Sequence, residues 1–274
     1  MTRRAVPYLA GMLGILVLAG PVAAQTPDPA RVIDLGQPDF TLSSLPTTME
    51  MPAHTLAFRL THRFTRPIDE GTAGDFFRDF FGFDSAARIG LELRYGLWRG
   101  TQVAIYRTND RAIQLSAQQT VLRQTANRWF SVDAFGAVDG ADNFTENYAT
   151  SVGAVVSHVF AQKAAVYVHP IYVWNVAEAP VPDGAPDWSA VIGLGIRYRI
   201  GASKVYLVAE AAPQVGGLKD GADHVSFAIE RRAGAHMFQF TVANNLGTSM
   251  RQVARGGVNP GDWYVGFNLT RRFY

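Results

Sequence analysis

The sequence predicts an all-β fold, a transmembrane antiparallel up-and-down β-barrel of about 12 strands. First, apolar and polar residues alternate with period two in segment after segment from residue 54 to the end, as in strands with one face in lipid and one in a polar lumen. Second, the links between these segments are alternately short and long. Third, no stretch after residue 24 approaches the roughly 18 consecutive apolar residues of a membrane helix, whereas a spanning strand needs only about 9–11 residues. Counts of about 10 or 14 strands also fit an even-numbered barrel.

The first residues have the three parts of a secretory signal peptide. Arg3 and Arg4 supply positive charge, residues 8–19 form a short apolar run, and "GPVAAQ" offers small residues before a cut ahead of Gln25. These features predict export and cleavage.

A membrane anchor is the alternative for this region. The apolar run is shorter than the roughly 20 residues of a spanning helix, and Pro21 interrupts it. We therefore expect a signal peptide over 1–24, a mature N-terminal segment over 25–53 and the transmembrane barrel over 54–274. The mature segment is proline-rich, polar and aperiodic, with room for one short strand.

Composition excludes some classes of function. The chain has 25 basic and 23 acidic residues and no cysteine. No Lys/Arg run is concentrated on one element, so a nucleic-acid partner is not expected. Without disulfides, an exported chain depends on packing or on the bilayer for its stability.

The first two expected strands have clear faces. In "TLAFRLTHRFT" the apolar face carries Leu56, Phe58, Leu60 and Phe64, and the polar face carries Thr55, Arg59, Thr61 and Arg63. In "RIGLELRYGL" the apolar face carries Ile89, Leu91, Leu93, Tyr95 and Leu97, and the polar face carries Arg88, Glu92 and Arg94. We expect the apolar faces to meet lipid and the polar faces to line the lumen.

Ten further strands follow from the same alternation. They are expected at 101–108, 112–123, 128–138, 147–160, 164–175, 188–200, 203–213, 223–231, 235–243 and 262–273. In "SAVIGLGIRYRI", Gly193 and Gly195 alternate with apolar residues.

Short and long links alternate between successive strands. Links after even-numbered strands are short: "WRG", "QTAN", "AQK", "GAS" and "RAG". Links after odd-numbered strands are mostly long: 66–85, 140–146, 177–187, 215–222 and 244–261, with only "NDR" brief. Outer-membrane barrels have short periplasmic turns and long external loops, so we expect both termini on the periplasmic side, at the bacterial outer membrane.

The last strand, "GDWYVGFNLTRRFY", has to pair with the first so that no strand edge meets lipid. Taken alone it also suits an edge strand of a soluble sandwich, but the sorted loops favour the barrel. Phe273 and Tyr274 fit the aromatic girdle at the membrane interface. The aromatic ending resembles the signal that barrel-insertion machinery recognises, so this machinery and outer-membrane lipid are the expected partners.

Several stretches together resemble one family. "PTTMEMPAHTLAFRLTHRF", "FFGFDSAARIGLELRYGL", "GAHMFQFTVANN" and "GDWYVGFNLTRRF" are similar, in content and order, to the β-barrel family catalogued as domain of unknown function 5777. The resemblance runs from about residue 46 to the end. It implies an outer-membrane-type barrel, and it supplies neither an activity nor catalytic residues.

The first long loop contains "TAGDFFRDFFGF", which breaks the alternation. Phe76, Phe77, Phe80 and Phe81 would share one face of a short helix. Three roles remain open for this mouth segment: a plug in the mouth, a helix on the outer leaflet, or a cap on neighbouring loops.

The sequence predicts neither a metal site nor a catalytic site. His62, His158 and His236 have the lipid-facing parity near strand ends, with His62 at the opposite rim, so they cannot converge within the about 2.0–2.2 Å of one ion that metal ligation requires. No G-x-S-x-G elbow appears. We therefore expect no metal, no cofactor and no catalytic residues, and an outer-membrane hydrolase is the weaker alternative.

Inward-facing charges are the candidate lumen lining. Arginines predominate on the last, first and second strands, with Glu92 among them and further acids on other strands. The candidates are Arg59, Arg63, Arg88, Glu92, Arg94, Glu210, Glu230 and Arg272, and Asp133 lies on the fifth strand. An arginine wall favours anions, and about 12 strands enclose only a narrow lumen. We expect a narrow channel or binding barrel for small anionic solutes. The alternative is a closed structural barrel in which the arginines pair with Glu92, Glu210 and Glu230 and the mouth segment seals one end.

Overall fold

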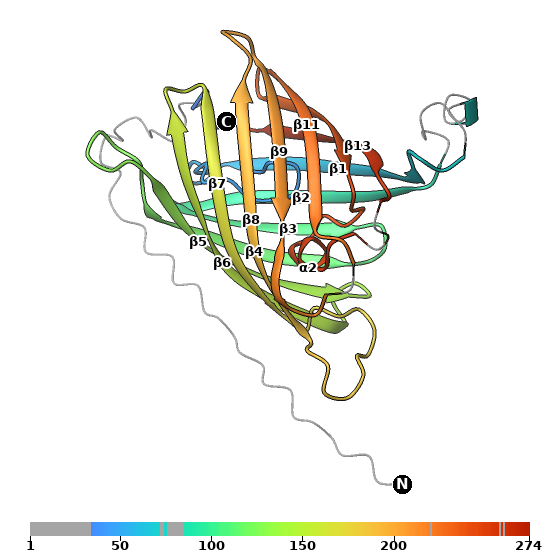
Figure 1. The fold of residues 1–274 in the computed structure, drawn as a ribbon. Helices are drawn as coiled ribbons and strands as arrows, with labels where there is room; N and C mark the ends of the chain where they lie inside the picture. The colour runs from blue at the N-terminus through green and yellow to red at the C-terminus, as the bar shows by residue number, and fades with distance from the viewer. Residues whose placement is uncertain (1–33, 72–73, 76–84, 220, 258, 260) are drawn as a thin grey trace.

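The computed structural model describes residues 34–71, 74–75, 85–219, 221–257, 259 and 261–274 (Figure 1). The expected signal peptide, and Phe76, Phe77, Phe80 and Phe81 of the mouth segment, lie outside the described residues. No helix within the described part of the chain is long and apolar enough to cross a membrane.

Strands dominate the fold. They are β1 Leu56–Pro67, β2 Ala87–Trp98, β3 Thr101–Thr108, β4 Ile113–Leu122, β5 Ser131–Ala141, β6 Glu146–Phe160, β7 Ala164–Trp174, β8 Trp188–Arg199, β9 Val205–Ala212, β10 Gln214–Gly217, β11 His224–Ala233, β12 His236–Ala243 and β13 Tyr264–Arg272.

β9 and β10 are two halves of one strand. They lie on either side of Pro213, which has no N–H for the ladder, and both pair with β8. The register continues across the proline, with Leu194 opposite Ala211 and Val191 opposite Gln214, and shifts between Gln214 and Gly216. The barrel is therefore a closed antiparallel ring of 12 strands, and the expected fold class is confirmed.

The ring closes between the first and last strands. Ala57 on β1 lies opposite Arg272 on β13, and the pairing continues to Arg63 and Gly266. Every other strand pairs with its neighbours in the chain. Because the first and last strands pair, the wall closes on itself and its strands satisfy one another's backbone groups, as a spanning structure requires.

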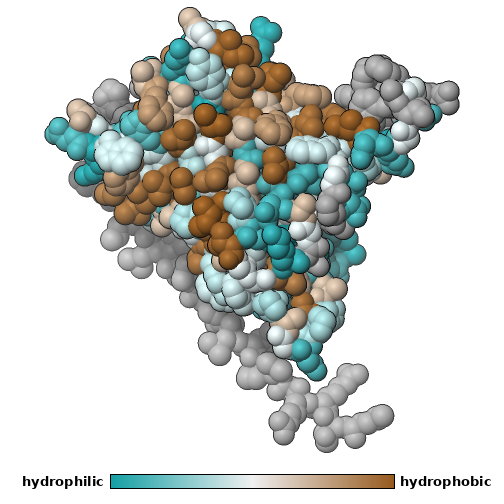
Figure 2. Space-filling model, in the orientation of Figure 1, coloured by the Kyte–Doolittle hydropathy of each residue, from teal (hydrophilic) through white to brown (hydrophobic). Residues whose placement is uncertain are grey.

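The two faces of the wall differ in polarity. Large apolar side chains of the outer face are exposed; they include Leu91, Leu93, Ile105, Leu115, Leu194, Ile196, Leu207, Phe227, Ile229, Phe238 and Phe240. Figure 2 shows such residues covering much of the visible wall. The alternate positions point inward and are largely polar, which is the binary pattern of a membrane barrel.

The ends of the barrel differ in their connections. The links at one end span 99–100, 123–130, 161–163, 200–204 and 234–235, and we call this the short-turn end. The other, long-loop end has links over 68–86, 109–112, 142–145, 175–187, 218–223 and 244–263. Two links differ from expectation. The link after β4 is longer, because Thr125 and Arg128 form an isolated bridge; the link after β5 is short, because β5 continues to Ala141.

Two segments fold into the barrel instead of lying outside it. Residues 34–53, named here the inner segment, precede β1. The loop between β12 and β13 carries the helix α2, Met250–Arg255. Buried side chains from both meet the wall in one apolar cluster, which includes Leu42, Leu45, Met250 and Val253.

Candidate functional site

The inner segment forms a loop inside the lumen. Prolines and the absence of period-two alternation prevent it from forming a strand. Instead Leu42 N donates to Leu45 O and Thr47 N donates to Phe40 O, both at 2.8 Å, which closes a tight turn. Leu42 and Leu45 are fully buried.

Both ends of the inner segment lie at the short-turn end. Gly36 is packed against Val159 and Gln162, next to the turn between β6 and β7. At its other end, His54 N donates to Gly96 O near the end of β2. The segment therefore enters and leaves the lumen through the same mouth.

Wall side chains satisfy the carbonyl groups of the segment. A chain without strand partners leaves buried carbonyls that need donors. Arg59 Nη2 donates to Ser43 O and Arg197 Nη2 donates to Thr41 O, both at 2.7 Å. His169 Nε2 and Gln118 Nε2 likewise lie 2.7 Å from the carbonyl oxygens of Pro46 and Thr47, respectively.

Glu210 satisfies the amides at the turn. Its carboxylate accepts from the backbone N–H groups of Ser43, Ser44 and Leu45 at 3.0, 2.8 and 3.2 Å. Its other polar neighbour is His224, whose Nε2 lies 2.9 Å from Oε1. Three converging amides form a small anion-binding concavity, and a wall carboxylate fills it.

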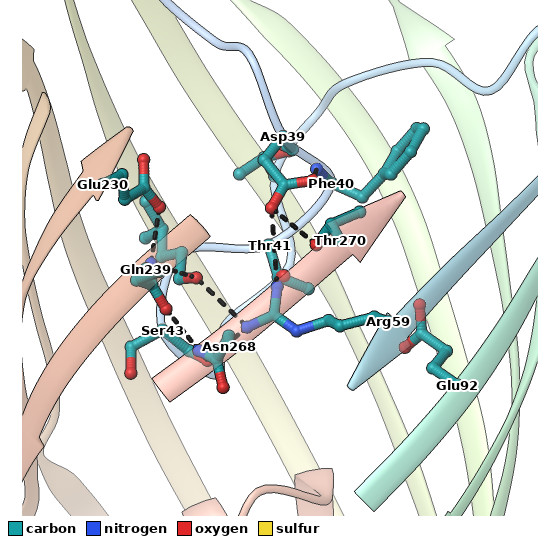
Figure 3. A network of polar contacts seen from close by, with 12 residues as sticks. Asp39, Phe40, Thr41, Ser43, Arg59, Glu92, Glu230, Gln239, Asn268 and Thr270 are labelled. Carbon is teal, nitrogen blue, oxygen red and sulfur yellow. Dashed lines mark hydrogen bonds and ion pairs between the residues drawn. The ribbon is translucent and has the colours of Figure 1, made fainter. Parts of the chain in front are cut away.

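The inner segment is acidic, and its carboxylates meet wall cations. It carries Asp34, Asp39 and Glu50 and no Lys or Arg. Asp39 Oδ2 lies 3.8 Å from Arg59 Nη1 and accepts from Thr270 Oγ1 at 3.0 Å (Figure 3). Glu50 pairs with Arg123 at 3.2 Å.

The sequence-predicted lumen residues have different surroundings. Arg59, Arg63, Arg94, Arg272, Glu210 and Glu230 are buried inside the barrel. Glu92 is partly buried and pairs with Arg94 at 3.0 Å. Arg88 is half-buried toward the long-loop end, 3.3 Å from Asp110, and so lies apart from the others.

The pairing differs from that expected of a closed structural barrel. Arg94 does pair with Glu92. Glu230, however, binds Arg197 through two contacts of 2.8 and 2.9 Å, and Glu210 binds the inner segment. Arg197 has inward parity in "GIRYRI", so the alternation alone could have identified it. The inner segment has no periodicity, and no pattern in the sequence places it in the lumen.

The loop that carries α2 packs against the inner face of the wall toward the long-loop end. Ser249 and Gln252 form a reciprocal capping box at the start of the helix. Arg251 donates to Val176 O at 3.1 Å and to Asn147 O at 2.9 Å, and also contacts Ala177 O. Burial lowers the pKa of the Arg251 guanidinium. The helix is thus fixed to the loop after β7.

A small cavity lies between the two inserted segments. Its volume is about 40 Å³, and its lining includes Thr41 and Ser43 of the inner segment, Arg59 and Arg94 of the wall, and Thr248 next to α2. A second cavity of about 680 Å³ lies at the short-turn end, beside Gln37 and Glu50. Among the described residues, no three His, Cys, Asp or Glu side chains form a group that could hold a metal ion.

Comparison with known proteins places this geometry among membrane barrels. The family model described as membrane bound beta barrel domain (DUF5777) matches residues 39–273. A comparison with curated protein sequences found no match. The NanC porin structure is similar in fold at a TM-score of 0.52 and 9% identity, covering 79% of this chain and 98% of that one.

Two further solved structures are similar at lower scores. An outer membrane channel from Pseudomonas putida F1 has a TM-score of 0.47 and 12% identity, covering 81% of this chain and 97% of that one. Outer membrane phospholipase A from Escherichia coli has a TM-score of 0.43 and 14% identity, covering 82% and 91%.

Proposed function

Because the chain belongs to the family of membrane bound beta barrel domains, DUF5777, we propose that it is an outer-membrane channel that its own inner segment holds closed. When the segment leaves, the lumen passes small anionic solutes. In this proposal the short-turn end faces the periplasm, and the segment withdraws to that side.

The polarity of the wall beneath the inner segment carries the proposal. The groups that hold the segment are charged or polar side chains, among them Arg59, His169, Arg197 and Glu210. If the segment withdraws, water can form hydrogen bonds with each of these groups. Opening the lumen therefore leaves few polar groups buried without a partner. The polar lining is therefore compatible with an open state as well as with the closed one.

The route of withdrawal also supports gating. Both ends of the inner segment lie at one mouth, so it can leave as a loop without threading its end through the barrel. The cavity of about 680 Å³ beside Gln37 and Glu50 provides space at that mouth.

The solute class follows from charge. Withdrawal removes Asp39 and Glu50 from the wall and no cation. Arg59 then loses its acidic partner Asp39, and Arg123 loses Glu50 while keeping Asp133. Arginine-lined constrictions favour anions because guanidinium groups replace part of an anion's hydration.

A disulfide across the segment and the wall tests the proposal. Thr48 Oγ1 and Ser157 Oγ lie 2.5 Å apart, which suits a disulfide between Thr48→Cys and Ser157→Cys, and the chain has no other cysteine. In planar bilayers we expect no current from the oxidised double variant, intermittent current after reduction, and continuous current from a variant lacking residues 35–52. Single Thr48→Cys is the control, and oxidant should not change its current.

The same recordings test solute class and closure. In a KCl gradient, the reversal potential of the shortened variant should show anion preference, which Arg59→Ala with Arg94→Ala should abolish; cation preference would contradict it. If the shortened variant assembles, as judged by heat-modifiable gel migration, and carries no current, the channel proposal is wrong.

A permanently closed structural barrel is the second candidate. The apolar cluster favours it, because Leu42 and Leu45 of the inner segment pack with Val155, Tyr167 and Val173 of the wall. For the hydrolase alternative, the lumen histidines offer no support: His169 contacts Pro46 O and His224 contacts Glu210, and neither contact is to a serine.

A further inference from the structure

The carboxylate of Asp39 is bound by a cross-strand pair of the wall. Arg59 on β1 and Thr270 on β13 lie directly opposite each other in the register. Thr270 Oγ1 donates to Asp39 Oδ2 at 3.0 Å, and Arg59 Nη1 is 3.8 Å from the same oxygen. The side chains of Arg59 and Asp39 are only 7% and 4% exposed, so the contact is shielded from solvent.

The surroundings of this pair contain more cations than anions. Arg59, Arg63, Arg94 and Arg272 are all buried on β1, β2 and β13. Among the described residues, neither Arg63 nor Arg272 has a carboxylate within salt-bridge distance. Arg63 donates to Asn268 Oδ1 at 2.9 Å, and Arg272 donates to Pro38 O at 3.4 Å. Within ion-pair distance, these four guanidinium groups meet two carboxylates, Asp39 and Glu92, with Glu210 farther from Arg63. If Asp39 leaves, only Glu92 remains at that distance.

The small cavity provides room beside the same arginine. Arg59, Arg94 and Thr41 line it, and Thr41 Oγ1 is buried without a hydrogen-bond partner in the part of the chain that the structure describes. A volume of about 40 Å³ exceeds the roughly 10–15 Å³ that one water needs. The space therefore suits a carboxylate group or a few waters.

We propose that Arg59 and Thr270, with Arg94 at the cavity, form a binding site for small carboxylate solutes, which Asp39 occupies as an internal ligand in the closed state. A carboxylate solute competes with Asp39 and so favours the state in which the inner segment has withdrawn. This inference rests on the proposed function, because it requires that the segment can leave.

Linkage sets the direction of the effect. A solute that binds only the state without Asp39 in the site shifts the population toward that state, and the shift grows with solute concentration over its dissociation constant. A neutral analogue of the same shape cannot replace the charge-assisted contacts to Arg59 and should shift the population far less.

Thiol labelling measures withdrawal without measuring current. Thr48 is 2% exposed, so Thr48→Cys reacts with a membrane-impermeant maleimide only when the segment leaves its seat. With purified full-length protein in detergent, we expect succinate to accelerate labelling roughly tenfold or more, from the strength of hydrogen bonds to charged groups. Succinamide and an equal ionic strength of sodium chloride should have much weaker effects.

Variants in the Thr48→Cys background locate the site. Asp39→Asn should label faster without succinate, because the internal ligand has lost its charge. Arg59→Gln should lose the difference between succinate and succinamide, whatever its basal rate. Arg107→Gln is the matched control: Arg107 is exposed and contacts Asn143 at the long-loop end, so it should keep the full response.

The outcomes separate the two proposals. Equal acceleration by succinate and succinamide, or a succinate response that survives Arg59→Gln, would overturn the carboxylate site even if the shortened variant conducts. A charge-dependent response that Arg59→Gln abolishes would support the site even if conductance is absent, in which case the protein binds carboxylates without passing them.

Discussion

Arg197 and Glu230 are both fully buried, and their ion pair has two short contacts within the lumen. Removing one member of such a pair leaves a charge without a partner or water. Arg88 and Asp110 form a matched pair that solvent reaches, with side chains 32% and 35% exposed. Exposed pairs contribute little, because solvent screens them.

We therefore predict different costs for two isosteric changes. Glu230→Gln should lower the free energy of unfolding by about 3–5 kcal/mol, whereas Asp110→Asn should lower it by at most about 1 kcal/mol. Urea unfolding in detergent, followed by the fraction that still migrates as the folded form, measures both. Equal midpoints would mean that the lumen around Arg197 is hydrated.

At the scale of elements, β8 is shaped to accept the inner segment. Gly193 and Gly195 have inward parity on this strand. A Cβ at Gly195 would lie 2.2 Å from Leu42 Cδ1, and one at Gly193 would lie 3.0 Å from Leu45 Cδ1. The two glycines therefore leave the space into which the turn of the segment packs.

Filling that space should displace the segment. We predict that Gly195→Leu, in the Thr48→Cys background, increases the rate of maleimide labelling several-fold, because overpacking in a filled interior costs roughly 1–3 kcal/mol. Gly136→Leu is the control, since a Cβ there meets only Ser151 O, at 3.8 Å. An unchanged rate in Gly195→Leu would show that the segment and β8 adapt to each other.

The elements differ in how far their sequence determines them. Strands such as β2 and β13 could be located to within a few residues, because period-two alternation is local and the membrane imposes it along each strand. The inner segment could not be placed, because its polar partners lie far along the chain: Glu210 binds Ser43 and Asn268 binds Ser43 O. The role of "GLG" in β8 was equally hidden, since only the packed segment explains the missing side chains.

At the scale of the whole molecule, the apolar outer wall determines how the barrel sits in lipid. Leu91 is 47% exposed on this wall, and Arg88 lies on the inward parity of the same strand near the rim. An arginine on the lipid face near the bilayer midplane costs about 2–4 kcal/mol, whereas inward positions avoid hydrocarbon.

We predict that Leu91→Arg assembles poorly and that Arg88→Leu assembles nearly as the natural chain does. The measurement is the fraction of heat-modifiable protein recovered after insertion into lipid vesicles. Similar recovery of the two variants would place β2 in the opposite register to the one described.

The candidate site, too, could be predicted only in part from local sequence pattern. Inward parity was enough to select Arg59, Arg94 and Glu210 as lumen residues. It could not reveal what they bind. Parity shows only which wall side chains point inward, whereas the group that they bind is the inner segment, another part of the chain. For the same reason, the strand residues alone overstate the positive charge of the lumen, because Asp39 and Glu50 come from the inner segment.

The looped path of the inner segment has a consequence for how the protein is made. Because residues 36 and 54 lie at the same mouth, the wall can be completed, from first strand to last, before anything enters it. Filling the lumen is then a separate final event that requires no passage of a chain end across the membrane. If assembly follows that order, a newly inserted barrel is unsealed until the segment enters, and the time from insertion to sealing is a property that the cell has to tolerate or shorten.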